Sequence, residues 1–237
     1  MIPISDNNTG RTITPFVNYI LIAINILVFV AFQNMGSNWA FLASFSTVPK
    51  EILTGMDITS GGLGVSPEPV YLTLFTAMFM HGSIAHLGGN LLYLWVFGDN
   101  LENVMGHVKY LVFYLLTGLI ASMCHVWLTS FTGNDMLIPS LGASGAISGV
   151  LGGYLLLFPK NEVRVFVLMS VMHVPAFITL GLWIGLQLIS GWGSLGGSGG
   201  GVAYAAHVGG FIAGLVLVKF FTNRRDKNEY LSNFKEQ

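Results

Sequence analysis

Apolar residues dominate six stretches of the chain, which polar or glycine-rich segments separate. A helix needs roughly 17 to 25 apolar residues to cross the hydrocarbon core of a bilayer, and these stretches are near that length. The fourth is shorter and rich in glycine, so its ends are poorly defined. The pattern predicts an all-α polytopic membrane bundle of six transmembrane helices over 17–34, 84–101, 107–130, 143–158, 164–190 and 202–221.

The first stretch follows a short polar segment that contains Arg11, as the apolar part of a signal peptide would. Residues 33–36, Gln-Asn-Met-Gly, make a poor cleavage site, and five more spans follow, which favours a retained helix. We therefore expect one six-span core over 17–221. An N-terminal segment, 1–16, and a polar tail, 222–237, flank it.

Composition supports a membrane protein over a soluble one. The chain is 53% hydrophobic and 9% charged, whereas soluble domains carry roughly 25% charged residues. The net charge of −1 gives no basic surface for nucleic acid, so nucleic acid is excluded as a partner. The single cysteine, Cys124, cannot form an internal disulfide.

Lysine and arginine gather on one side of the predicted bundle, as they do in cytoplasmic loops. Six spans put both termini on that side, and only Lys50 falls in a loop on the other. We expect both termini in the cytoplasm, and the compact form without further domains favours a bacterial cytoplasmic (inner) membrane. The cytoplasmic cations are Arg11, Lys109, Lys160, Arg164, Arg224, Arg225, Lys227 and Lys235.

Two of the outer loops have unusual compositions. Loop 35–70 is longer than most connections and carries aromatic residues, so we expect it to fold back onto the membrane surface. Loop 191–201 is mostly glycine and serine, a composition typical of a mobile cover. A mobile cover suits a site that opens to a large substrate. Pro175, within the fifth stretch, is a candidate kink.

Four polar residues lie at similar depth in this topology. His86 and Asn90 open the second span, Ser144 the fourth and His207 the sixth, and all three spans run inward from the outer face. At about 1.5 Å rise per residue, each side chain lies within roughly 10 Å of the start of its helix. His86 and Asn90 are four residues apart and therefore share a helix face. Glycine and alanine repeat every four residues beside Ser144 and His207, a pattern that lets membrane helices approach closely.

Taken singly, each residue has an ordinary structural explanation. Most membrane serines bond to their own helix, and a lone histidine often makes an interhelical hydrogen bond. Together, Ser144 and His207 indicate a nucleophile and its base, because a serine hydroxyl is weak until a base takes its proton. Histidine suits this role, with an ordinary pKa near 6.5. Asp99 and Glu102 lie roughly 13 Å or more along the helix from Asn90, so the expected unit is a dyad.

These motifs resemble the rhomboid family of intramembrane serine proteases over about 71–215. The resemblance rests on Phe-Met-His-Gly-Ser-Ile-Ala-His-Leu-Gly-Gly-Asn at 79–90, Gly-Ala-Ser-Gly-Ala at 142–146 and the Ala-His-x-x-Gly-x-x-x-Gly run at 206–214. It implies a catalytic Ser144–His207 dyad and an oxyanion hole formed by His86, Asn90 and the Ser144 amide. Loop 35–70 and loop 191–201 then match the family's first loop and its cap. The supporting positions are His81, Gly142, Gly145 and Gly210.

The sequence departs from the family at three places. The first loop has no Trp-Arg pair, and Val202 stands where a glycine is common five residues before the histidine. Some members carry a tyrosine four residues after the serine, stacked on the histidine, and this chain has Ser148 there. None of these changes removes a catalytic group, but His207 must be oriented by another residue. We expect His81 to brace the first loop through hydrogen bonds.

The resulting hypothesis is an endopeptidase that cleaves single-span membrane proteins near the outer face, since a paired helix must unwind before it exposes a carbonyl. No cofactor or metal is expected, and no His-Glu-x-x-His motif indicates a zinc protease. An aspartyl protease needs two facing aspartates, and only Asp99 lies near a span. A transporter would need a polar path across the whole bilayer. The serious alternative is a non-catalytic rhomboid relative that binds membrane clients.

Overall fold

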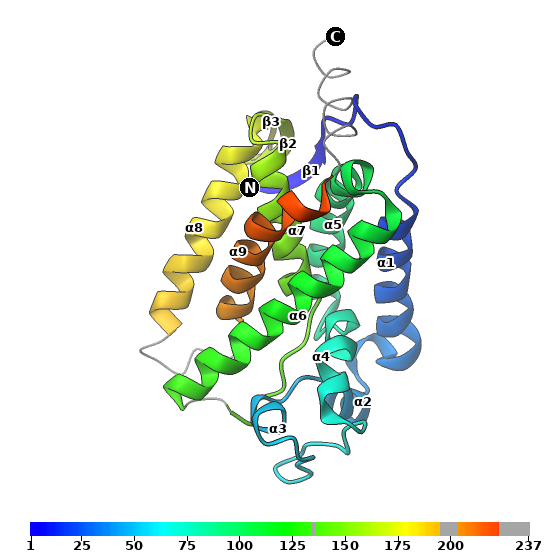
Figure 1. Cartoon of the computed structure of the whole chain (residues 1–237), viewed down its shortest axis with the longest axis vertical. Helices are drawn as coiled ribbons and strands as arrows, with labels where there is room; N and C mark the ends of the chain where they lie inside the picture. The colour runs from blue at the N-terminus through cyan, green and yellow to red at the C-terminus, as the bar shows by residue number, and fades with distance from the viewer. Residues whose placement is uncertain (134–135, 195–202, 223–237) are drawn as a thin grey trace.

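The described residues form six long helices, which run roughly along the long axis of the molecule (Figure 1). The computed structural model describes residues 1–133, 136–194 and 203–222. Helix α7 lies in the middle, between α5, α6 and α9, while α1 and α8 lie on opposite sides of the bundle. The long helices are α1 (Phe16–Leu27), α5 (Ile84–Met105), α6 (His107–Thr132), α7 (Ser144–Leu157), α8 (Ala176–Ser194) and α9 (Tyr204–Phe221).

Short helices fill one end of the bundle, at the bottom of Figure 1. A π-helical segment, Val28–Phe32, continues α1, and a 3₁₀ turn, Asn34–Gly36, ends it. The long loop then contains α2 (Trp39–Phe45) and α3 (Pro49–Thr54), followed by a 3₁₀ turn at Val70–Leu72, α4 (Thr73–Thr76) and a 3₁₀ turn at Ala77–Phe79. Thr47 and Ser140 exchange two backbone hydrogen bonds of 2.8 and 2.9 Å, which tie this loop to the segment before α7.

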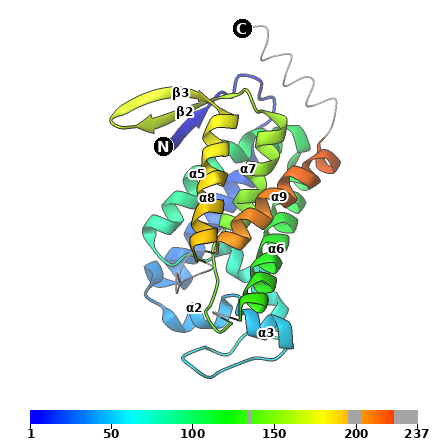
Figure 2. The ribbon, with the colours of Figure 1, turned by 90° about the vertical axis from the view of Figure 1, so that its left-hand side faces the viewer.

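A three-stranded antiparallel sheet lies at the other end and projects sideways from the helices (Figure 2). The strands are β1 (Ile2–Asp6), β2 (Glu162–Val167) and β3 (Ser170–Pro175), in that order. The prediction of a fifth span over 164–190 is therefore wrong at its start. Val163 and Val165 are buried and alternate with exposed neighbours, the two-residue period of a strand, which a count of apolar residues overlooks. Pro175 ends β3 and is not a kink within α8.

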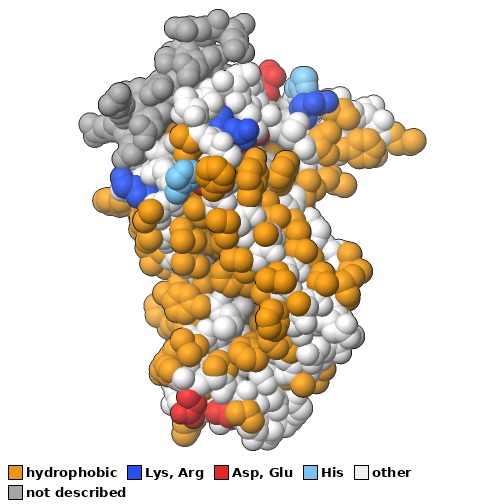
Figure 3. Space-filling model, turned by 90° about the vertical axis from the view of Figure 1, so that its right-hand side faces the viewer, with side chains coloured by type: hydrophobic (Ala, Val, Ile, Leu, Met, Phe, Trp, Pro, Cys, Tyr) orange, Lys and Arg blue, Asp and Glu red, His pale blue; other side chains and the backbone are white. Residues whose placement is uncertain are grey.

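The structure supports an integral membrane protein. Within the described part of the chain, α6, residues 176–193 of α8 and α9 are long and apolar enough to cross a bilayer. Val70–Phe79 and α5 form a fourth candidate that is bent by 79°. The remaining two predicted spans correspond to shorter apolar helices, Phe16–Phe32 and α7. Apolar side chains cover the middle of the face shown in Figure 3, while lysine and arginine lie near one end and acidic groups lie near both ends.

Helix α7 is the core of the bundle. Eleven of its residues are buried, among them the fully buried Leu151 and Tyr154. Because its neighbours surround it, α7 has little surface to offer lipid, and its short length is compatible with a central position. The apolar core around it takes side chains from α5, α6 and α9, including Leu94, Phe97 and Phe113.

The N-terminal segment is fastened to the C-terminal end of α5. Glu102 accepts hydrogen bonds from the backbone of Val17 and Asn18 at 2.9 and 2.7 Å and so caps the start of α1. Arg11 forms an ion pair with Asp99 at 2.8 Å. Residues 1–16 are thus held against the helices by specific contacts.

Candidate active site

Ser144 and His207 are in direct contact. Ser144 is the first residue of α7, and His207 lies in the first turn of α9. The Ser144 Oγ atom lies 2.8 Å from Nε2 of His207, which is hydrogen-bond distance. The two side chains are partly buried, so the pair is reachable from a cavity yet shielded from bulk water.

Close packing of α7 and α9 produces this contact. A Cβ atom on Gly210 would collide with the carbonyl oxygen of Gly145, and one on Gly214 would collide with that of Gly149. The backbones therefore approach as closely as glycine allows, as the four-residue spacing predicted. Ser148 donates a hydrogen bond of 2.6 Å to the Ser144 carbonyl oxygen within α7.

The other nitrogen of His207 is also engaged. Its Nδ1 atom lies 2.7 Å from Oε1 of Gln187, a residue of α8. The rings of Trp183 and Tyr204 flank the imidazole, with centroids 6.0 and 6.4 Å away. The sequence analysis missed Gln187. The available signal was the single amide side chain in a mostly apolar helix, which is a functional candidate inside a membrane.

Asn90 and His86 face the same cavity as Ser144. Asn90 is 7% exposed, and its side-chain amide nitrogen is buried without a hydrogen-bond partner among the described residues. A buried unpaired donor is unusual and needs an explanation, which a ligand oxygen would supply. The His86 ring lies beside Gly142, where a Cβ atom would be 2.9 Å from the imidazole.

Gly142 has a φ of 131°, a conformation that side chains rarely adopt. Its amide donates to the Ala77 carbonyl oxygen at 2.9 Å, which turns the chain into α7. Glycine is needed here for the backbone conformation and for the space that His86 occupies. This geometry gives a physical reason for the glycine that precedes Ala143 and Ser144.

His81 is fully buried beside the site. Its backbone exchanges two hydrogen bonds with the Gln33 side chain, of 2.8 and 3.0 Å. The imidazole nitrogens, in contrast, have no hydrogen-bond partner within the described residues, and the ring meets His86 edge-on at 5.1 Å. The link to Gln33, just after the Val28–Phe32 segment, therefore runs through the backbone at position 81, whereas we expected the side chain to brace the loop.

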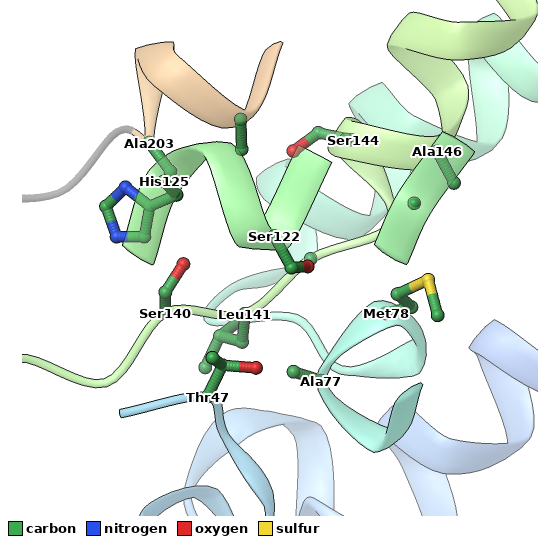
Figure 4. Close-up of a pocket in the computed structure, with 14 residues that line it drawn as sticks. Thr47, Ala77, Met78, Ser122, His125, Ser140, Leu141, Ser144, Ala146 and Ala203 are labelled. Atoms are coloured by element: carbon green, nitrogen blue, oxygen red, sulfur yellow. The ribbon is translucent and has the colours of Figure 1, made fainter. Parts of the chain in front are cut away.

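Two cavities adjoin the serine. The larger, of about 530 Å³, has the size of a ligand site and is lined by α5, α7, α8 and α9, with Tyr93 and Trp183 among its walls. The smaller, of about 20 Å³, lies behind Ser144 and has polar walls from Thr47, Ser122 and Ser140 (Figure 4). A polar cavity of that size holds about one water molecule.

The acidic residues of α5 lie away from this pair. Asp99 and Glu102 contact the N-terminal segment near the C-terminal end of the helix. In the described part of the chain, no group of three or more His, Cys, Asp or Glu side chains is arranged to hold a metal ion.

A helical bundle with an apolar surface and a hydrogen-bonded serine–histidine pair defines a membrane protein with the parts of a serine hydrolase site. The family model called Rhomboid domain matches residues 68–224. The chain belongs to the rhomboid family.

Similar proteins come from mitochondria and bacteria. The mitochondrial Rhomboid protein 1 of Saccharomyces cerevisiae is 30% identical over 211 residues, covering 88% of this chain and 54% of that protein. Rhomboid protease GluP of Bacillus subtilis is 29% identical over 199 residues, 82% of this chain and 35% of that protein. Presenilin-associated rhomboid-like protein A of Danio rerio, also mitochondrial, is 30% identical over 152 residues, which cover 63% of this chain and 37% of that protein. The chain spans about a third to a half of the length of these relatives.

Proposed function

We propose that this protein is an intramembrane serine endopeptidase that uses Ser144 as nucleophile and His207 as general base. The 2.8 Å contact between Ser144 Oγ and His207 Nε2 carries the proposal. Family membership supports it, since the similar GluP is named a protease. A non-catalytic relative that binds clients has no need of this contact.

The reaction follows from the positions of the side chains. Ser144 Oγ attacks a peptide carbonyl carbon while His207 Nε2 takes its proton, and the new oxyanion accepts hydrogen bonds from Asn90, His86 and the Ser144 amide. His207 then gives the proton to the leaving amine, which releases one product and leaves an acyl-serine. The amide of Ser144 is available because the first N–H groups of a helix have no partner inside it.

Hydrolysis of the acyl-serine needs one water molecule. We place its reservoir in the small polar cavity behind Ser144, among Thr47, Ser122 and Ser140. His207 takes a proton from that water as the oxygen attacks the acyl carbon, and Ser144 regains its proton when the ester breaks. The polar walls would hold water at a depth where lipid excludes it.

The larger cavity supports a proposal for the substrate class. Its walls include α5 and α8, so a chain lying in the membrane would reach Ser144 between these helices. A transmembrane helix pairs all its backbone groups and must unwind locally before a carbonyl can enter. The favoured substrates are single-span proteins with glycine, proline or polar residues near the end of the helix.

The topology belongs to the same proposal. We infer six spans, with α1 and the central α7 as the two short ones, and both termini on the side that carries Arg11, Lys109 and Arg164. The core over 17–221 stays a prediction. Most of loop 191–201 and nearly all of the tail 222–237 lie outside the described residues. The bacterial cytoplasmic membrane stays a prediction from the sequence alone, since the similar proteins include mitochondrial ones.

Labelling with a fluorescent fluorophosphonate in liposomes tests the proposal. The native protein is expected to be labelled and to cleave a single-span reporter, while Ser144→Ala abolishes both and His207→Ala slows labelling at least 100-fold. Ser148→Ala is the matched control, because its hydroxyl bonds only to the α7 backbone in the described structure. Labelling that persists in Ser144→Ala would refute the nucleophile. Stable folding without any labelling would favour the client-binding alternative.

A further inference from the structure

His207 has two ring nitrogens, and only one of them can face Ser144. To accept the serine proton, Nε2 must be unprotonated, so the neutral ring must carry its proton on Nδ1. In many hydrolases a carboxylate fixes this tautomer. Asp99 and Glu102 contact the N-terminal segment instead, and no carboxylate meets His207 in the described structure.

The Nδ1 atom of His207 meets Gln187 Oε1 at 2.7 Å. An amide oxygen only accepts hydrogen bonds, so this contact requires the proton to be on Nδ1. The opposite orientation of the amide would present an N–H group to Nδ1 and force the proton onto Nε2, where it would oppose the Ser144 hydroxyl. The Ser144 contact and the amide oxygen thus select the same tautomer.

We propose that Gln187 is the positioning residue that holds His207 in its basic tautomer and aims Nε2 at Ser144. The proposal rests on the proposed function and adds the residue that takes the place of a triad acid. Trp183 and Tyr204 restrict the plane of the ring by contact, whereas Gln187 bonds to Nδ1 and so distinguishes it from the Nε2 that faces Ser144.

The position of Gln187 gives this contact a further consequence. Gln187 belongs to α8. Only 17% of the apolar part of α8 that could cross a membrane is buried inside the molecule, against 33% for α6 and for α9. Gln187 also lines the larger cavity beside Ser144 and His207. A displacement of α8 would therefore lengthen the bond to Nδ1 and release the ring, so orientation of the base depends on a loosely held helix.

Two substitutions separate hydrogen bonding from packing. Gln187→Met keeps the length of the side chain and removes the acceptor, so kcat should fall about tenfold with KM nearly unchanged, the effect of one neutral hydrogen bond. Gln187→Glu keeps an acceptor and adds negative charge. It should retain more activity than Gln187→Met, and the acidic limb of its rate–pH profile should move to higher pH. Leu188→Met, at a half-exposed neighbour on α8, is the control for methionine in this helix.

Nitrogen-15 spectra of protein labelled in its histidine rings provide a readout that does not need activity. The His207 signal, assigned with His207→Ala, should show a protonated Nδ1 in the native protein and a mixture of tautomers in Gln187→Met. Native tautomer populations in Gln187→Met, or native kcat in that variant, would overturn the proposal. If the tautomer shifts as expected while native protein fails to label at Ser144, the proposed function fails and the positioning role stands.

Discussion

The side chains of the site differ in how readily the sequence identifies them as functional. Ser144, His207, His86 and Asn90 sit in recognisable motifs, and the structure brings all four to the same cavity. Gln187 belongs to no motif, and its role depends on how α8 packs against α9. That packing is a tertiary property, which no local pattern around residue 187 encodes.

Asn90→Asp tests the unpaired amide. The substitution keeps the shape of the side chain and replaces the donor –NH2 with an oxygen, so an oxyanion loses one hydrogen bond and meets a carboxylate. We expect kcat for a reporter substrate to fall about 100-fold or more. Because Asn90 is mostly buried, we also expect the unpaired carboxylate to lower the thermal unfolding temperature. The matched control is Asn34→Asp, at an exposed turn after α1. Unchanged kcat in Asn90→Asp would remove this residue from the oxyanion hole.

Helix packing can be tested with two glycines. In Gly210→Ala the new methyl group would meet the Gly145 carbonyl oxygen, and backbone cannot move aside as a flexible side chain can. We expect α7 and α9 to separate, with a loss of about 1–3 kcal/mol of stability and a large loss of fluorophosphonate labelling. Thermal unfolding in detergent and the labelling rate measure the two effects.

Gly181→Ala is the control, since nothing lies within 4 Å of a Cβ atom there. This variant should be at least as stable as the native protein, because alanine favours a helix by up to about 1 kcal/mol. Equal behaviour of the two variants would show that close approach of α7 and α9 is not needed.

Elements were predictable where apolar residues form one unbroken helix. The second, third and sixth stretches correspond to α5, α6 and α9 within a few residues. The stretch 164–190 was predicted as one helix, whereas its first residues, up to Pro175, belong to the strands β2 and β3. The partner that makes β2 part of a sheet, β1, lies about 160 residues earlier, so the pairing could not be foreseen from the local pattern alone.

At the scale of the whole molecule, Asp6 connects the N-terminus to the helices. Its Oδ2 accepts hydrogen bonds from Asn100 and, at 2.5 Å, from the Tyr154 hydroxyl, and Asn161 lies at 3.3 Å. Burial, and then the charge of Asp99, raise the pKa of Asp6 from 3.8 to about 8. Between these two pH values, the Asp6 carboxyl group therefore keeps its proton in the docked segment, whereas a free chain would release it.

This linkage makes the docking of β1 dependent on pH. Because the pKa of Asp6 is raised when β1 is docked, the contribution of protonated Asp6 to docking is complete below about pH 4. It is lost as the pH rises through about 8. Hydrogen exchange in residues 2–6, corrected for intrinsic rates, should be faster at pH 9 than at pH 6. Asp6→Asn should remove this difference, and Asp57→Asn, at the opposite end of the molecule, should leave it intact. Equal protection at both values of pH in the native protein would contradict the linkage.

The order of the helices along the chain also matters during synthesis. Ser144 emerges 63 residues before His207, and the histidine lies in the last described helix. A nascent polypeptide halted before α9 would hold a hydroxyl with no base and an unfilled face on α7. The proposed dyad would therefore be complete only after synthesis has reached His207 in α9.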